Sequence, residues 1–426
     1  MINQRKNFIR PDWLIITIYI LLAGFGIGNI LSSSISGEEI KLFEFNNLYS
    51  KQLVFFMVSL MFAFIVMTIE VKFYERFASI FYLISIVVLL GLFFFGKRVN
   101  GALSWYDLGG FNLQPSEFVK ITVALAISKF ISDFQTNLKK TTDQFWLFLL
   151  ILIPVIIIII QNDTGSSIVF FCLFIVFYRE GISQKYLLSI LAISVLAIFT
   201  LKFSAMHSYL FSLVLTIIFF VFKRKMNNKI IKGFSISCLC LLTCFVVDYS
   251  YKNVLRTHQQ NYIKVWLNLE KDPAKIKKME RTVLYNLNES KKAISSGGLV
   301  GKGYMKGTRT MGNFVPAQHS DYIFSTVGEE WGFAGSTFII ILYLILIYRV
   351  VYLSELQKNK FSRVYGYSTA SILFIHFCIN IGMVLGLTPT IGIPLPFLSY
   401  GGSSLIAFTI LLFIFVRFDA NKINEW

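Results

Sequence analysis

Residues 145–161, FWLFLLILIPVIIIIIQ, are the stretch that decides the fold. The run has no charged residue and does not alternate apolar with polar side chains. Helices and closed barrels are the two structures that satisfy their own backbone hydrogen bonds in lipid, and barrel strands alternate. The run is also close to the roughly 20 apolar residues that a membrane-spanning helix needs. It therefore predicts an all-α, polytopic membrane helix bundle.

Similar apolar runs recur along the chain and give twelve candidate spans. We interpret the first as an uncleaved anchor, because no small-residue cleavage site follows it. The twelve are 13–33, 52–69, 77–95, 116–134, 145–161, 164–178, 187–203, 208–222, 233–249, 321–349, 366–388 and 401–418.

The composition excludes the soluble classes of protein. Of 426 residues, 55% are hydrophobic and 15% are charged, whereas a soluble domain carries about 25% charge. The same numbers exclude a disordered chain, collagen and a coiled coil. All five cysteines fall in apolar runs, so neither a disulfide framework nor a cysteine metal site is expected. They are Cys172, Cys238, Cys240, Cys244 and Cys378.

The formal charge of +17 is explained by its distribution along the chain. With the N-terminus inside, the cytoplasmic segments carry 21 Lys and Arg, and the short outer segments carry five. This asymmetry is the positive-inside pattern of membrane proteins. It predicts that both termini are cytoplasmic, and it leaves no reason to expect nucleic acid as a partner.

One connection, residues 251–320, is much longer than the others, and long connections are usually functional. This long loop holds 13 Lys and Arg against four acidic residues. It is either a basic surface on anionic lipid headgroups or a cradle for an anionic substrate at the outer face. Within it, 256–270 predicts an interfacial helix with Tyr262, Val265 and Trp266 as its apolar stripe.

Two polar segments lie next to apolar runs. In QPSEFVK, 114–120, Pro115 suits a first helical position, and Glu117 can pair with Lys120 one turn later. Lys120 can alternatively hold a phosphate. In QNDTGSS, 161–167, the pattern predicts a tight corner that caps the next helix.

The glycine-rich stretch SSGGLVGKG, 295–303, nearly meets the spacing of a nucleotide-binding loop. Gly303 stands where that motif needs Ser or Thr, and the stretch is predicted to lie outside the membrane on its outer side, where no nucleotide is expected. We therefore reject a nucleotide site here.

The segment VPAQHSDYIF, 315–324, precedes a long apolar run and is followed by GEEWG, 328–332. We expect Asp321 to open the helix from the outer side. Either Ser320 or Asp321 simply caps that helix, or Asp321 is a general base at the mouth of a membrane cavity. Glu329, about 12 Å deeper by helical rise, is expected to be structural.

The segment TPTIGIPLPFLSYGGSS, 388–404, breaks the helical pattern with three prolines and three glycines. Irregular backbone at membrane depth is tolerated where it lines a cavity or is buried in protein. His376 and Asn380, one turn apart in the preceding run, are expected to make interhelical hydrogen bonds rather than bind metal.

Together these segments resemble the SEDS family (shape, elongation, division and sporulation), whose members polymerise lipid II into peptidoglycan glycan strands. Six stretches match in family order: 100–120, 161–167, 257–273, 296–310, 315–332 and 392–404. The GEEWG stretch is more similar to the elongation-type member than to the division-type member. The whole chain, 1–426, is then one membrane domain that contains the long loop.

The chain departs from the family pattern in places. The family usually has ten helices, so a hairpin at 187–222 is a possible insertion. Ser104 stands where many relatives have Arg, Asn313 where division-type relatives have Glu, and Ala317 where an acid is common.

The resemblance implies that Asp321 is the base that activates the acceptor sugar. Transfer is expected to invert the anomeric centre, because only one strong carboxylate candidate is visible. The cations Lys120, Lys302, Lys306 and Arg309 would stabilise the leaving pyrophosphate. The remaining residues expected in the substrate site are Glu117, His319, Ser320, Ser399 and Tyr400.

The resemblance also implies partners and a place in the cell. We expect a class B penicillin-binding protein transpeptidase as partner, membrane lipids around the chain, and an active site on the outer face of the bacterial inner membrane. A divalent cation (Mg or Mn) is plausible, although no ligand cluster indicates it. The alternatives are a lipid II flippase, a division-type polymerase and a scaffold without catalysis.

Overall fold

The computed structural model describes residues 11–422, except 35–46, 100, 204, 223–228, 256 and several positions between 271 and 283. Several basic residues used in the orientation count lie outside the described residues, namely Arg5, Lys6, Arg10, Lys41, Lys223, Arg224 and Lys225. The chain divides into two compact units, Met1–Ile182 with Asn286–Trp426, and Ser183–Tyr285.

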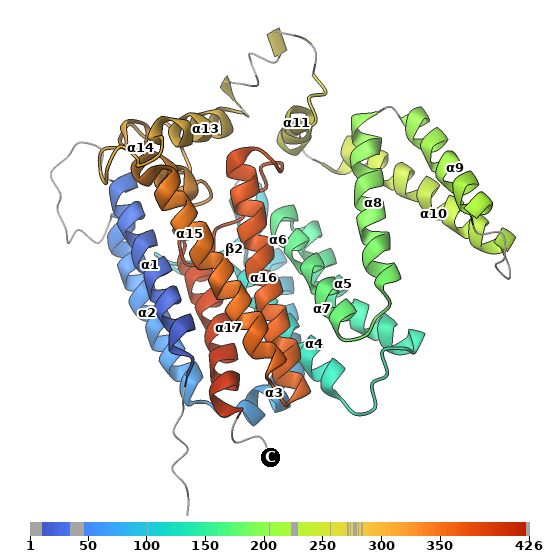
Figure 1. Ribbon diagram of the computed structural model, residues 1–426, viewed down its shortest axis with the longest axis horizontal. Helices are drawn as coiled ribbons and strands as arrows, with labels where there is room; N and C mark the ends of the chain where they lie inside the picture. Colours follow the sequence, from blue (N-terminus) through green and yellow to red (C-terminus); the bar gives the residue numbers. More distant parts are fainter. Residues whose placement is uncertain are drawn as a thin grey trace, which may run out of the picture. The chain divides into compact units, whose positions relative to one another are not determined.

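The first unit is a helix bundle (Figure 1) in which α1, α2, α15, α16 and α17 run alongside one another. Of the long helices, α17 is the most enclosed, and it packs against α2, α4 and α16. The helices are α1 (Trp13–Ser34), α2 (Leu48–Thr68), α3 (Val71–Phe95), α4 (Pro115–Ser132), α5 (Thr141–Ile160), α6 (Thr164–Val169), η1 (Phe170–Cys172), α7 (Leu173–Arg179), α13 (Tyr285–Gly297), α14 (Thr308–Met311), α15 (Ile323–Glu355), α16 (Lys360–Leu385) and α17 (Gly402–Asn421).

The second unit contains α8 (Gln184–Lys202), α9 (Ala205–Phe222), α10 (Lys229–Tyr249), η2 (Ser250–Val254) and α11 (Thr257–Trp266). Small residues lie where α8 meets α10, and the Thr200 hydroxyl contacts the Cys244 sulfur at 3.5 Å. The helix predicted over 256–270 corresponds to α11, which ends before Asn268, a residue in the left-handed conformation with φ 52°. Its interfacial location stays a prediction. The predicted hairpin 187–222 corresponds to α8 and α9, and its status as an insertion stays a prediction.

Among the described residues, nine helices are long and apolar enough to cross a membrane. Each of the twelve predicted runs is helical over most of its length, which confirms the all-α polytopic bundle. The run at 164–178 is interrupted, however, by the short 3₁₀ segment η1 between α6 and α7.

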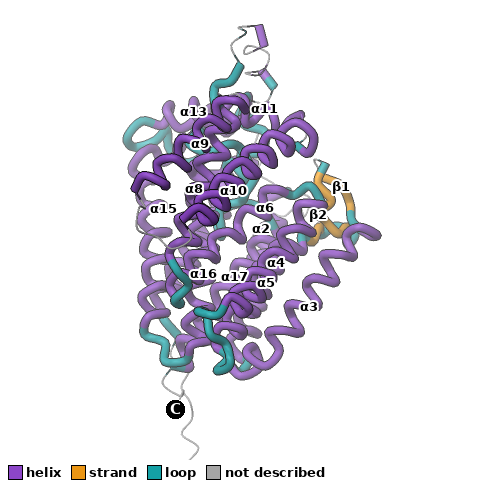
Figure 2. The backbone as a smooth tube through the Cα atoms, turned by 90° about the vertical axis from the view of Figure 1, so that its right-hand side faces the viewer, coloured by secondary structure: helices purple, strands orange, loops and turns teal. Residues whose placement is uncertain are grey.

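A small antiparallel sheet, absent from our predictions, precedes α4. It consists of β1 (Lys97–Val99), β2 (Ala102–Asp107) and β3 (Asn112–Leu113), in that order. Figure 2 shows β1 and β2 beside the end of α3, where the Tyr106 hydroxyl donates to the Val88 carbonyl at 2.8 Å. The Asn100–Gly101 pair, a strong hairpin signal, was the clue in the sequence.

The ends of the helices follow ordinary capping rules. Pro115 begins α4, as predicted, and Glu117 lies in its first turn. The Asn359 side chain caps α16 by accepting from the Phe361 N–H, and Gly386 ends the same helix with φ 78°. The C-terminal end of α16 therefore turns sharply into the proline-rich segment that carries the site.

α15 is broken at Gly332, which has φ 64° and ψ −159°. The break frees backbone groups on both sides, and the glycine-rich stretch 298–303 pairs with them. The N–H groups of Lys302 and Gly303 donate to the Glu329 and Glu330 carbonyls, each at 3.0 Å. In return, the N–H groups of Phe333 and Ala334 donate to the Gly298 and Leu299 carbonyls, so these four bonds replace helical bonds at the break.

Candidate functional site

Two segments form the candidate site at one end of the first unit, residues 315–322 and 386–401. The Ser399 hydroxyl donates to the Ser320 carbonyl at 2.7 Å, and the Tyr400 N–H donates to the His319 carbonyl at 2.8 Å. These two bonds fasten the segments together side by side. Four of the residues predicted for the substrate site, His319, Ser320, Ser399 and Tyr400, are thus brought together.

Asp321 does not open α15, contrary to our prediction. The helix begins at Ile323, and its N-cap residue, Tyr322, makes no side-chain capping bond. The chain turns before the helix, since the Ser320 and Tyr322 N–H groups both donate to the Ala317 carbonyl. This turn leaves the Asp321 carboxyl out of the cap, which removes the capping-only interpretation of that residue.

The Asp321 carboxyl faces the proline-rich segment at Gly392. A Cβ atom built on Gly392 would lie 3.3 Å from Asp321 Oδ2, and Gly392 has φ 75°. A larger residue would therefore both strain the backbone and crowd the carboxylate. Burial raises the pKa of the Asp321 carboxyl to about 6. A carboxyl with that pKa is ionised at neutral pH and still basic enough to accept a proton.

His319 and Tyr400 form the adjacent wall. Their rings meet edge to face with centroids 5.7 Å apart. Burial lowers the pKa of His319, so its imidazole is neutral at neutral pH. A phenol and a neutral imidazole offer hydrogen bonds to hydroxyl groups without adding charge, which suits a sugar.

Glu117 and Lys120 pair as predicted, but deep in the bundle. Lys120 Nζ donates to Glu117 Oε1 at 2.8 Å and to His376 Nε2 at 2.9 Å, and it lies 4.9 Å from the Phe408 ring centre. The Lys120 side chain is 2% exposed and that of Glu117 is 3% exposed. The charge of Lys120 is therefore already used within the protein, which weighs against a direct contact with substrate.

The corner at 161–167 caps α6, as predicted. Asp163 Oδ1 accepts from the Ser166 N–H at 3.1 Å. Gly165 then packs against the proline-rich segment, because a Cβ there would lie 2.9 Å from the Ile391 carbonyl oxygen. This corner buttresses the segment that faces Asp321.

The glycine-rich stretch binds a protein carboxylate. Glu329, 0% exposed, accepts from Lys302 Nζ at 2.6 Å and from the backbone N–H groups of Arg309 and Thr310 at 3.0 and 2.8 Å. The hydroxyl of Thr310 donates at 2.8 Å as well. Glu329 is therefore structural, as predicted, and it holds residues 302–310 on α15.

The predicted pyrophosphate cations differ in their surroundings. Lys302 pairs with Glu329, and the Arg309 guanidinium pairs with Glu289 on α13 and lies 5.8 Å from the Phe314 ring centre. Lys306 is exposed. Of the four predicted cations, Lys306 is thus the one best placed to meet an anion from solvent.

Replacement of Glu329 by alanine is expected to destabilise the protein by roughly 3–5 kcal/mol, because it leaves Lys302 and two N–H groups without their acceptor. The unfolding temperature in detergent measures this loss. Lys97→Ala, which removes an exposed ion pair with Asp107, is the control and is expected to leave that temperature unchanged. Equal unfolding temperatures for the two variants would show that Glu329 does not anchor the loop.

The described residues contain no cluster of three or more His, Cys, Asp or Glu side chains. Binding of Mg or Mn stays a prediction.

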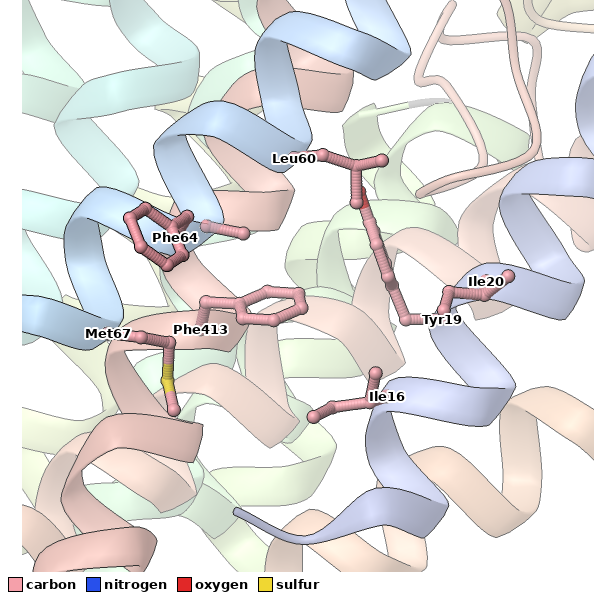
Figure 3. A pocket seen from close by; sticks show the side chains of 8 residues that line it. Ile16, Tyr19, Ile20, Leu60, Phe64, Met67 and Phe413 are labelled. Atoms are coloured by element: carbon pink, nitrogen blue, oxygen red, sulfur yellow. The ribbon is translucent and has the colours of Figure 1, made fainter. Parts of the chain in front are cut away.

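A separate apolar groove lies between α1, α2 and α17 (Figure 3). Tyr19 is its one residue with a polar side-chain atom, and that hydroxyl is bonded to Ser59 and Thr409 at 3.2 and 3.0 Å. None of the predicted site residues lines it. Its residues are Ile16, Tyr19, Ile20, Leu60, Ala63, Phe64, Met67 and Phe413.

The bundle and its site define a multi-pass helical membrane protein with a carboxyl group set between two fastened segments at one end. The chain belongs to the SEDS family, the family of FtsW, RodA and SpoVE. The family model, described as a cell cycle protein, matches residues 12–237 and 208–424. The two matched ranges overlap within the second unit, where the surplus hairpin is predicted.

Two curated relatives span nearly the whole chain. Peptidoglycan glycosyltransferase MrdB of Escherichia coli K12 is 30% identical over 394 residues, which are 91% of this chain and 88% of the relative. A probable peptidoglycan glycosyltransferase FtsW of Wigglesworthia glossinidia brevipalpis is 27% identical over 437 residues, covering 100% and 98%.

Two solved structures share the fold. A chain from a study of a peptidoglycan synthase complex that coordinates polymerisation and crosslinking aligns with a TM-score of 0.72 at 22% identity, covering 97% of this chain and 99% of that one. The rod shape determining protein RodA of Thermus thermophilus aligns with a TM-score of 0.63 at 21% identity, covering 98% and 99%.

Proposed function

We propose that this chain is a peptidoglycan glycosyltransferase that polymerises lipid II, with Asp321 as the general base. The names of its relatives support the activity. The observation that carries the role of Asp321 is its position. Its carboxyl, on the segment that also carries His319, lies before the start of α15 and faces Gly392, where a Cβ would be 3.3 Å from Oδ2.

The reaction assigns one task to each group. Asp321 takes the proton of the acceptor sugar hydroxyl while that oxygen bonds to the anomeric carbon of the growing chain. The bond from the anomeric carbon to the pyrophosphate breaks, and polyprenyl pyrophosphate leaves. We expect a single displacement, which inverts the anomeric centre. The other route, double displacement, needs a second carboxyl about 5–5.5 Å from the first. Lys306 is the candidate cation for the leaving group.

The rate of polymerisation is expected to fall as the pH drops through about 6. The base must be ionised to accept a proton, and burial raises the pKa of Asp321 to about 6. Above this pH the carboxylate is present and the rate is on a plateau. The initial rate with purified protein, measured from pH 5 to 8, tests this, and an acid limb centred near pH 4 would contradict it.

The direct test of the function is incubation of the purified protein with lipid II, followed by gel analysis of glycan length. Glycan strands are expected without any partner protein. The alternative, a lipid II flippase, predicts transfer of labelled lipid between leaflets without lengthening of glycan. Such transfer, in the absence of strands, would decide against the polymerase.

Orientation and partner also belong to this proposal. We place the site on the outer face of the bacterial inner membrane, since the basic residues Arg179, Arg349 and Arg417 lie at the opposite end of their helices from the site. Both termini would then be cytoplasmic. We further propose an elongation role with a class B penicillin-binding protein. The likeness to a chain from a peptidoglycan synthase complex supports that partner.

A further inference from the structure

The proline-rich segment facing Asp321 is held by side chains from three helices. These bonds join backbone atoms of residues 393–401 to polar groups that are themselves buried. Asn380 donates to the Ile393 carbonyl, His376 to the Pro394 carbonyl, Tyr343 to the Pro396 carbonyl and Gln52 to the Ser399 carbonyl. The Gln52 side-chain oxygen in turn accepts from the Gly401 N–H.

Asn380 joins the two sides of the site directly. Its amide Nδ2 donates to the Asp321 carbonyl at 2.9 Å and to the Ile393 carbonyl at 2.8 Å, and the residue is 0% exposed. Two carbonyls accept hydrogen bonds and donate none, so the amide must present its nitrogen to both. Both amide hydrogens are therefore committed to fixing Asp321 beside the residue that follows Gly392.

His376, one turn before Asn380 on α16, fastens the next carbonyl. Its Nδ1 lies 3.2 Å from the Pro394 carbonyl oxygen, which can only accept, so Nδ1 carries the proton. In the neutral ring, Nε2 is then an acceptor, and Lys120 donates to it at 2.9 Å. The bonds form one directed chain, in which Lys120 donates to both Glu117 and His376, and His376 donates to Pro394.

We propose that Asn380 and His376 are positioning residues for the transfer reaction. They set the separation between the Asp321 carboxylate and the proline-rich segment at Gly392. Glu117 and Lys120 act through His376, by holding its ring in the tautomer that donates to Pro394. The inference rests on the proposed function, since it assigns these residues a part in that reaction.

The position of the proline-rich segment matters because Gly392 lies close to the Asp321 carboxylate. A Cβ atom on Gly392 would already lie 3.3 Å from the carboxylate. A misplacement of about 1 Å in a catalytic arrangement can cost about 10²-fold in rate. Asn380 and His376, which hold this segment in place, are thus expected to affect kcat more than the KM for lipid II.

Three substitutions of His376 separate its two bonds. In His376→Asn the amide nitrogen occupies the place of Nδ1 and can still donate to Pro394. His376→Gln instead places its terminal amide near Nε2, where it can accept from Lys120 but not reach Pro394. The His376 ring packs edge to face on Phe408, with ring centroids 4.7 Å apart. His376→Phe keeps an aromatic ring in that place and loses both hydrogen bonds.

We expect His376→Asn to keep kcat within about threefold of the unsubstituted protein, whereas Gln and Phe lower kcat about 10–100-fold at unchanged KM. The reverse order, with Gln active and Asn inactive, would overturn the proposal, because the Lys120 contact would then be the one that matters. Equal kcat for all three would overturn it as well. So would failure of both Asn and Gln to fold, judged by unfolding in detergent.

Asn380→Leu supplies the second measurement. The variant keeps roughly the size of the side chain and removes both donors without adding a charge beside Asp321. We expect a similar loss of kcat, and an acid limb of the rate profile shifted to lower pH, because water reaches the Asp321 carboxyl when the proline-rich segment is held less firmly. An unchanged kcat and acid limb would overturn the proposal. Failure of the unsubstituted protein to polymerise lipid II would instead refute the proposed function.

Discussion

Asp321→Asn is expected to lower the rate of lipid II polymerisation by roughly 10²–10⁴-fold, the usual contribution of a general base. Asparagine keeps the size of the side chain, and its amide cannot accept the proton of the acceptor hydroxyl. The backbone carbonyl of residue 321 still accepts from Asn380, so the two fastened segments are expected to remain in place. Glycan length on gels and the initial rate with purified protein measure the effect.

Asp419→Asn is the matched control. Asp419 is a buried aspartate, 3% exposed, that lies near the end of α17 and accepts from Gln357 at 3.0 Å and Lys422 at 2.8 Å. Its replacement is expected to leave polymerisation intact. Polymerisation by purified Asp321→Asn at the unsubstituted rate would refute the assignment of Asp321 as the base.

The fold was predictable because lipid leaves few choices. A chain with long apolar runs can satisfy its backbone only through helices or a closed barrel, and runs such as 145–161 do not alternate. The sheet at 97–113 was not predicted, because its strands are three, six and two residues long and are too short to show a clear apolar periodicity. The adjacent Asn100 and Gly101 are nevertheless a hairpin signal in the sequence.

The two segments of the candidate site were predictable from the sequence, whereas the hydrogen bonds that join them were not. Broken helices near Pro394 and an acidic residue at 321 marked the two segments, and Ser399 and Tyr400 do lie beside His319 and Ser320. The sequence could not assign Lys302, because a lysine after glycines is equally able to hold a phosphate or a carboxylate. The choice depended on Glu329, 27 residues away, and on the break at Gly332 that brings the two together.

Gly332→Ala is expected to destabilise the protein by more than about 4–5 kcal/mol, which places it among the exceptional single substitutions. The conformation at Gly332, φ 64° and ψ −159°, is essentially restricted to glycine. A Cβ there would lie 2.3 Å from the Gly301 nitrogen and 2.8 Å from the Val300 carbonyl carbon. These are backbone atoms, so the clash cannot be relieved by rotating a side chain.

Gly332→Ala is also expected to disturb the candidate site, because residues 322–331 connect Gly332 to Asp321. If α15 straightens, the Glu329 and Glu330 carbonyls lose the N–H groups of Lys302 and Gly303, and the half-helix that follows Asp321 changes direction. Gly24→Ala is the control, since nothing lies within 4 Å of a Cβ on that exposed position of α1. It is expected to change stability by at most about 1 kcal/mol. Unfolding in detergent compares the two, and a Gly332→Ala protein as stable as Gly24→Ala would show that the break is not fixed by the glycine-rich stretch.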